Sequence, residues 1–300
     1  MRRLRLLGLV TSLVTAGVMV GAPALAAGGT PVPLTFNAAI FQMPGTSLMN
    51  GKVDPALNPC RMAGTPAAVA GTFADASVNS TGLPTGSYTP SGSPVAFTMP
   101  PASGNSAVCA GLSAPNMDTV TLTVPSGKYT DAYFLASVGN GPSLVNVTPA
   151  YGSTNGAALT TVFPDWCTAS TKVAGTLPPG STPGWAGGDR VNYDGTTTGQ
   201  TGLNCGLDVV HVSGLDGSKD LTGLTLQLAA AKTAIPDASS GGKGATQNAS
   251  ATLNIAAVTL ANSASLPKTG GNETGILIGI GLLLAGAALV IRPRLNRNAA

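Results

Sequence analysis

Short runs in which apolar and polar residues alternate fill the chain between Gly28 and Ser265. The clearest of them cover residues 34–38, 94–99, 119–124, 132–137, 158–163, 207–212, 223–228 and 253–260. A period of two predicts strands, and the Gly, Pro, Ser, Thr and Asn residues between the runs predict turns. No stretch of this region has an apolar period of 3.6 residues. The pattern predicts an all-β fold, a single large jelly-roll-like β-sandwich at residues 28–261.

Two stretches of this region break the alternation. Residues 170–195 are rich in glycine, and residues 234–249 are both polar and rich in glycine. Such composition is typical of connecting segments, so each stretch is predicted to be a long loop. No internal repeat is visible, which argues against a stalk of small stacked modules.

The N-terminus has a different composition. Three of the first five residues are arginine, residues 6–20 are apolar, and residues 24–26 read Ala-Leu-Ala. A basic start, an apolar segment and a small-residue cleavage site predict a signal peptide with a helical segment over residues 1–26. The alternative is an uncleaved membrane helix, which the cleavage pattern disfavours. We therefore expect an exported chain.

The C-terminus combines three features. A linker at residues 262–270 contains a five-residue motif, residues 275–291 form an uncharged apolar run, and the tail at 292–300 carries three arginines. Seventeen helical residues span about 25 Å, enough to cross the hydrocarbon core of a bilayer. We predict a transmembrane helix with its basic tail in the cytoplasm. The motif itself is Leu266, Pro267, Lys268, Thr269 and Gly270.

This segment resembles the cell-wall sorting signal (LPxTG) of Gram-positive surface proteins. The resemblance implies that a sortase attacks the carbonyl of Thr269 with a cysteine thiolate and cuts the bond to Gly270. An amine of the peptidoglycan precursor then takes over the acyl group. Pro267 biases Leu266 toward an extended geometry, which suits a peptide that enters an enzyme groove. The alternative is an ordinary membrane anchor in which the motif occurs by chance.

Removal of both ends changes the charge of the protein. The full chain has a formal charge of +3, but six of its eight arginines lie in the segments predicted to be removed. The mature part has seven lysines and two arginines against eleven aspartates, a net charge of −2. No basic patch for nucleic acid remains. The membrane is an expected partner only before sorting.

The four cysteines all lie in the exported part. An even number of cysteines outside the cytoplasm predicts two disulfides, for which three pairings are possible. We prefer the nearest-neighbour pairing, Cys60 with Cys109 and Cys167 with Cys205. A metal site is the rival interpretation, but the chain has no CxxC pair and His211 is its only histidine. No metal or other cofactor is therefore predicted.

The order of the predicted strands carries a second resemblance. Residues 124–129, 132–136, 139–141 and 163–167 look like parts of the galactose-binding-like β-sandwich modules found beside catalytic domains in secreted bacterial glycosidases. Looser similarity extends to residues 36–37, 71–75, 204–207 and 254–260. The resemblance implies that one carbohydrate-binding domain fills almost the whole mature chain.

Catalytic residues are not recognisable in the sequence. Glycoside hydrolysis commonly needs a pair of carboxylates, and the acids in predicted strands and turns form no such pair. They are Asp75, Asp118, Asp131, Asp165, Asp189, Asp194 and Asp208. His211 lies in an alternating strand, where a hydrogen-bonded structural role is more common than that of a catalytic base. We predict that the protein is not an enzyme.

One stretch concentrates the side chains that carbohydrate binding uses, an aromatic face flanked by planar hydrogen-bonding groups. The candidate ligand-binding residues in this predicted loop are Trp185, Asp189, Arg190, Asn192, Tyr193 and Asp194. A structural alternative remains open, in which Arg190 pairs with a neighbouring aspartate and Trp185 fills one end of the sandwich. The stretch also resembles a calcium-binding loop. The resemblance is weak, because a calcium loop ends in a bidentate Glu and none follows here.

Together these patterns predict a secreted protein, anchored to peptidoglycan at the outer face of the cell, whose β-sandwich binds a carbohydrate. The expected partners are a sortase, the peptidoglycan precursor and a glycan of the wall or its surroundings. One alternative is a structural component of the cell surface without a small ligand. A glycan-active enzyme is the third interpretation.

Overall fold

The computed structural model describes residues 28–38, 41–42, 71–74, 84, 86–101, 106–112, 116–166, 177–188, 190–192, 205–235 and 246–262. Every regular element in these residues is a β-strand, so the described part of the chain is all-β, as predicted. Most strands pair antiparallel, the pair of β2 (Phe41–Gln42) and β3 (Gly71–Ala74) being parallel. β13 (Arg190–Asn192) joins these two in a small sheet, and β4 (Ser87–Tyr88) pairs with β5 (Phe97–Thr98).

The central layer is a six-stranded sheet. Its order is β1–β16–β8–β14–β12, and β6 also pairs with β16. Its strands are β1 (Thr30–Pro31), β6 (Val108–Gly111), β8 (Asp131–Gly139), β12 (Ser181–Gly188), β14 (Cys205–Ser213) and β16 (Thr252–Ala261). The last strand of the described chain, β16, thus lies inside the sheet, with β8 on one side and β1 and β6 on the other.

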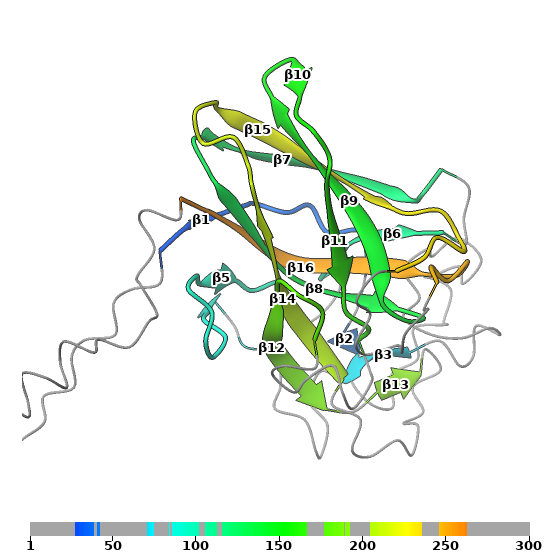
Figure 1. Ribbon diagram of the computed structural model, residues 1–300. Helices are drawn as coiled ribbons and strands as arrows, with labels where there is room; N and C mark the ends of the chain where they lie inside the picture. Colours follow the sequence, from blue (N-terminus) through cyan, green and yellow to red (C-terminus); the bar gives the residue numbers. More distant parts are fainter. Residues whose placement is uncertain are drawn as a thin grey trace, which may run out of the picture.

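A five-stranded sheet forms the neighbouring layer, above the central sheet in Figure 1. Its order is β10–β9–β15–β7, and β11 also pairs with β9. Its strands are β7 (Thr119–Gly127), β9 (Ser143–Tyr151), β10 (Thr154–Asn155), β11 (Leu159–Phe163) and β15 (Leu221–Leu228).

The two sheets share one hydrophobic core. Side chains from β7, β9, β11 and β15 pack there with side chains from β8, β14 and β16. Phe134 of β8 and Phe163 of β11 meet edge to face, with ring centroids 5.8 Å apart. Two antiparallel sheets that enclose a common core are consistent with a β-sandwich.

The central sheet is buried on its other face as well. A second cluster there contains Tyr133 and Leu135 of β8, Val209 of β14 and Phe97 of β5. For this reason all nine residues of β8 and all ten of β16 are buried. β7, by contrast, alternates between exposed and buried residues.

Six of the predicted strands coincide with β7, β8, β11, β14, β15 and β16. The strand predicted at 34–38 is wrong: residues 32–37 are irregular, and only Ala38 forms a bridge, with Ala107. The strand predicted at 94–99 shrinks to β5 and a bridge at Val95. Both runs are apolar because they cover the central sheet. A segment that covers a sheet with apolar side chains does not need to form a ladder of backbone hydrogen bonds.

Nine strands in the described part of the chain lie where none was predicted, and the two longest of them are β9 and β12. β9 alternates regularly but contains Pro149, which lies beyond the five residues paired with β11. β12 lies in the glycine-rich stretch predicted to be a loop. It is an edge strand, where proline is tolerated, and its register shifts between Pro183 and Trp185. A Cβ atom on Gly184 would lie 2.5 Å from the backbone oxygen of Leu207, so this glycine permits close packing.

The predicted signal helix and transmembrane helix lie outside the described residues. Within those residues, no helix is long and apolar enough to cross a membrane. Of the predicted loop at 234–249, the two ends are described, and Ala234 and Thr246 join in a bridge.

Candidate functional site

The prediction that the candidate ligand-binding residues lie in one loop is wrong. Trp185 belongs to β12, whereas Arg190 and Asn192 belong to β13, in a different sheet. The side chains of Arg190 and Asn192 are outside the described part. The same is true of Asp189, Tyr193 and Asp194.

Trp185 is buried, with 3% of its surface exposed. It packs in the second hydrophobic cluster with residues such as Leu207 and Val209. A sugar ring needs an open aromatic face for stacking, and this indole lacks one. Its burial agrees with the alternative in which Trp185 packs inside the molecule, although it packs beneath the sheet and not at one end of a sandwich.

His211 forms the best-defined polar site on the described surface. It lies in β14 directly opposite Tyr133 of β8, and this register places both rings on one face of the sheet. The rings stack with their centroids 4.4 Å apart and their planes at 3°. The imidazole is therefore held in one orientation by its cross-strand neighbour.

Asp131 holds the same imidazole by its edge. Its Oδ1 lies 2.6 Å from His211 Nε2, and the Asp131 and His211 side chains are 5% and 37% exposed. Thr130 donates a hydrogen bond from its hydroxyl to Asp131 Oδ2. Since an ionised carboxylate can only accept hydrogen bonds, Nε2 carries the proton of this contact. The other ring nitrogen, Nδ1, is left as the group that can meet a ligand.

The Tyr133 phenol is the third group of this site. Burial, and secondarily the negative charge of Asp131, raise the pKa of Tyr133 to about 12. Its hydroxyl thus stays protonated at neutral pH and can donate a hydrogen bond. The site combines a neutral phenol, a carboxylate and an oriented imidazole.

A cleft of about 220 Å³ opens beside these rings. Tyr133, His211 and Val209 line it from the sheet, and Thr182 of β12 lines its edge. The other lining residues are Gly92, Pro94, Gly180 and Ser181. It is smaller than the 300–1,000 Å³ typical of drug-sized ligands, so it suits a single small polar unit. We call these residues, together with Asp131, the His211 cleft.

The His211 cleft has no nucleophile in a Ser-His-Asp geometry. Ser181 is the serine among the lining residues, but it pairs with Val210, whose side chain lies in the sandwich core. Cross-strand partners share a face, so Ser181 and His211 point to opposite sides of the sheet. The Ser181 hydroxyl is buried and makes no hydrogen bond, which fits this orientation.

The remaining described acids are dispersed. Asp118 accepts a hydrogen bond from the Gln227 amide, and Asp165 accepts one from the Gly141 backbone. Asp208 is fully buried opposite Ala136. The described residues contain no group of three His, Cys, Asp or Glu that could hold a metal ion.

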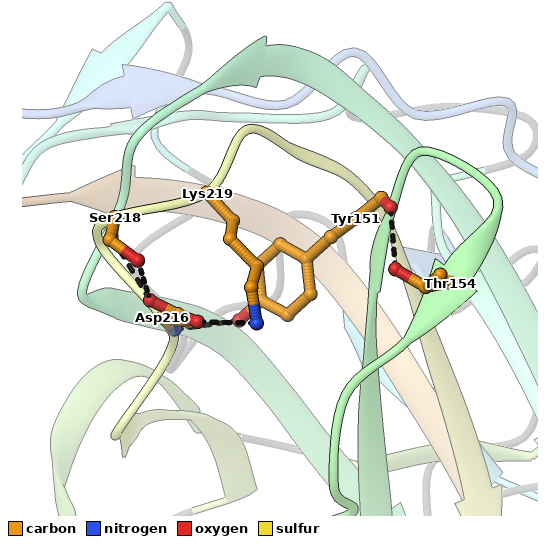
Figure 2. Close-up of polar contacts among 5 residues, drawn as sticks. All are labelled: Tyr151, Thr154, Asp216, Ser218 and Lys219. Atoms are coloured by element: carbon orange, nitrogen blue, oxygen red, sulfur yellow. Dashed lines mark hydrogen bonds and ion pairs between the residues drawn. The ribbon is translucent and has the colours of Figure 1, made fainter.

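A second polar cluster joins two loops (Figure 2). Asp216 Oδ2 lies 2.7 Å from Lys219 Nζ, and its Oδ1 accepts hydrogen bonds from Ser218. The backbone N–H of Asp216 donates to the Tyr151 hydroxyl at 2.6 Å. Lys219 Nζ lies 5.5 Å from the centre of the Tyr151 ring. Since the lysine lies over this aromatic face, the cluster is better suited to fastening the loops than to stacking on a sugar.

Cys109 of β6 is buried and disulfide-bonded. The side chains of Cys60, Cys167 and Cys205 lie outside the described part. Both predicted pairings therefore stay predictions.

Sequence reasoning considered Asp131 and His211 separately and missed their contact. The available signal was that Asp131 and Tyr133 flank one residue at the start of a predicted strand, which places both side chains on one face. The only histidine lies in another alternating strand. What the sequence lacked was the pairing of β8 with β14, since 80 residues separate Asp131 from His211.

The sorting motif from Leu266 to Gly270 lies beyond the last described residue, Asn262. A comparison of the chain with protein-family models finds no match. A comparison with curated proteins also finds none.

Proposed function

We propose that this chain is an exported surface protein that a sortase cuts between Thr269 and Gly270 and joins to peptidoglycan. The observation that carries the proposal is the order of signal peptide, LPKTG motif, apolar span and basic tail along one chain. Each part alone is common, but together they describe one route from export to covalent attachment.

The position of β16 gives this anchor a short reach. The strand ends at Ala261, and eight residues lead from Asn262 to Thr269. Fully extended, they span about 28 Å. The domain would therefore work within the wall layer or directly outside it. A force applied at the anchor would act on β16, which is hydrogen-bonded to neighbouring strands on both sides.

Replacement of the motif threonine tests the anchoring. We expect Thr269→Ala to move the protein from the wall fraction, released by muramidase, to the detergent-soluble membrane fraction. Ser265→Ala, just outside the motif, is the matched control and should stay in the wall. Wild-type protein that carries an intact hydrophobic tail, in cells with active sortase, would contradict the proposal.

We further propose that the β domain binds carbohydrate without cleaving it, and that the His211 cleft receives one neutral sugar unit. The supporting observation is the oriented imidazole, whose Nδ1 is not used by Asp131, beside the Thr182 hydroxyl and the Pro94 ring. The cleft size suits one pyranose, and hydroxyl groups suit the mixed donors and acceptors. The resemblance to galactose-binding-like modules motivates the same class of ligand.

Titration of the mature protein with soluble mono- and disaccharides tests the cleft. We expect His211→Ala and Thr182→Ala to weaken binding roughly tenfold, as the loss of a buried hydrogen bond does. Thr154→Ala, in the β10 hairpin, serves as a control for an exposed threonine. Equal affinity in all variants, or no sugar bound by the wild type, would favour the structural-component alternative.

A further inference from the structure

The five-stranded sheet carries no charged residue. Its five strands contain no Lys, Arg, Asp or Glu in any of their residues. Protein surfaces commonly have a quarter or more of their residues charged. Asp118 and Lys128 mark the limits of the uncharged strand β7. The carboxylate of Asp118 accepts hydrogen bonds from Thr119 and Gln227 at the edge of this sheet, and the strands themselves present only uncharged groups.

The outer face of this sheet bears polar side chains in rows across the strands. In the first row Thr121, Thr225 and Thr148 are direct neighbours on β7, β15 and β9. The second row runs through Thr119, Gln227, Asn146 and Thr160. Adjacent strands lie ~4.8 Å apart, and rows on one face lie ~6.8 Å apart. We call these seven residues the threonine face.

The threonine face is accessible. Thr119, Thr121, Thr160 and Gln227 are exposed, and Asn146, Thr148 and Thr225 are partly exposed. The alternating neighbours Val120, Leu122, Leu226 and Val147 point into the sandwich core, which fixes the outward direction of the polar groups. Thr121 and Thr225 share a hydroxyl contact of 3.4 Å, and Thr160 donates to Asn146 at 2.8 Å.

The chemistry of these groups selects among partners. Hydroxyl and amide groups both donate and accept hydrogen bonds, and none of them carries a charge. Anionic polymers find no cation on this face, and an apolar protein surface would leave its hydroxyl groups unpaired. A neutral polysaccharide presents hydroxyl groups along its length and requires no counter-charge.

We propose that the threonine face is a docking surface for a neutral polysaccharide chain, separate from the His211 cleft. The regular spacing of the rows lets one polysaccharide chain contact several of them at once. The proposal rests on the proposed function in one respect: a protein attached to the cell wall would meet a glycan near the wall first. The alternative explanation is that threonine recurs here merely because it is a good strand former.

Charges placed on the face test the proposal. Thr121→Lys/Thr148→Lys puts one lysine on each side of Thr225, on separate strands. The matched control is Thr35→Lys/Thr98→Lys, which adds the same charge at exposed residues outside the five-stranded sheet. The probes are two insoluble neutral polysaccharides, cellulose and chitin, in a sedimentation assay with the mature protein.

We expect the wild type and the control to bind at least one of these polymers equally, and the face variant to bind it at least tenfold more weakly. His211→Ala should keep polymer binding while it loses soluble sugar, which separates this surface from the cleft. Binding by the face variant at wild-type affinity, or no polymer bound by the wild type, would overturn the proposal. So would a wild-type dimer that the face variant dissociates, because the face would then be occupied by a second copy of the chain.

Discussion

The two sheets of the sandwich differ in what lies on their second face. The six-stranded sheet packs against hydrophobic clusters on both sides, and its polar side chains include the buried Asp131, which pairs with His211, and the exposed Thr182. The five-stranded sheet packs against the shared core on one side. Its other side carries the polar rows, and beside them Leu144 and Val162 pack against Ile235. Candidate chemistry that needs orientation lies in the first sheet, and a broad interaction surface lies on the second.

The shared core between the sheets should be the most sensitive region. Phe134 is fully buried and meets Phe163, so Phe134→Ala removes an aromatic ring and leaves a cavity. We expect a loss of about 3–5 kcal/mol in the free energy of unfolding. Thr121→Ala on the outer face should change it by less than about 1 kcal/mol. Urea unfolding followed by fluorescence measures both, and equal losses would remove the distinction between the faces.

Close packing at the edge of the central sheet comes next. Gly184→Ala would place a methyl group 2.5 Å from the Leu207 carbonyl oxygen and 2.6 Å from Leu135 Cδ1. We expect a loss of about 1–3 kcal/mol, because β12 must move away from β14. Thr182→Ala, an exposed neighbour in the same strand, is the control for strand propensity. Stability unchanged by Gly184→Ala would mean that β12 is not held against the sheet.

The Asp131–His211 pair should contribute less. Asp131→Asn keeps the shape but weakens the hydrogen bond to Nε2, with an expected loss of about 1–2 kcal/mol. The same change should lower the pKa of Tyr133 from about 12, since the negative charge of Asp131 contributes to its rise. Ultraviolet titration of tyrosine ionisation measures this shift, with Asp118→Asn as a control far from the ring. A Tyr133 pKa unchanged by Asp131→Asn would argue against a charged Asp131.

The smallest effect is expected at the loop fastened by Asp216. Hydrogen bonds from Lys219 and Ser218 lower the pKa of Asp216 to about 2, from an ordinary value of 3.8. A lowered pKa stabilises the folded state above pH 3.8, and this contribution disappears as the pH falls from 3.8 toward 2. The protection factor of the Ser218 amide in hydrogen exchange, which is the intrinsic rate at each pH divided by the observed rate, should fall in that window. Lys219→Met should narrow the pH window, and a protection factor that stays constant across it would show that the contact is not formed in solution.

The sequence predicted strands best where one face of a sheet meets solvent or where a run is strongly apolar. β7 and β15 alternate, and β8 and β16 are long runs of strand-forming residues, so all four were found. β12 was missed because its Pro and Gly residues indicate a loop in any local window. They are compatible with a strand only at a sheet edge that packs closely against its neighbour.

The candidate site shows the same division. A local concentration of aromatic and polar residues indicated a site at Trp185. An aromatic side chain is equally common in a hydrophobic core, and Trp185 is buried in the second cluster. The His211 cleft forms because β8 pairs with β14, which is distant in the chain, and this pairing cannot be predicted from local composition.

By itself, the sequence predicted the all-β class of the described residues, and it carries the motif on which the anchoring proposal rests. Those properties depend on local periodicity and on short linear patterns, which a chain carries before it folds. Tertiary structure alone decided which face of each strand is covered, that His211 meets Asp131 and Tyr133, and that threonines from three strands form one row. These features follow from strand order and register, which are set by the packing of distant segments against one another.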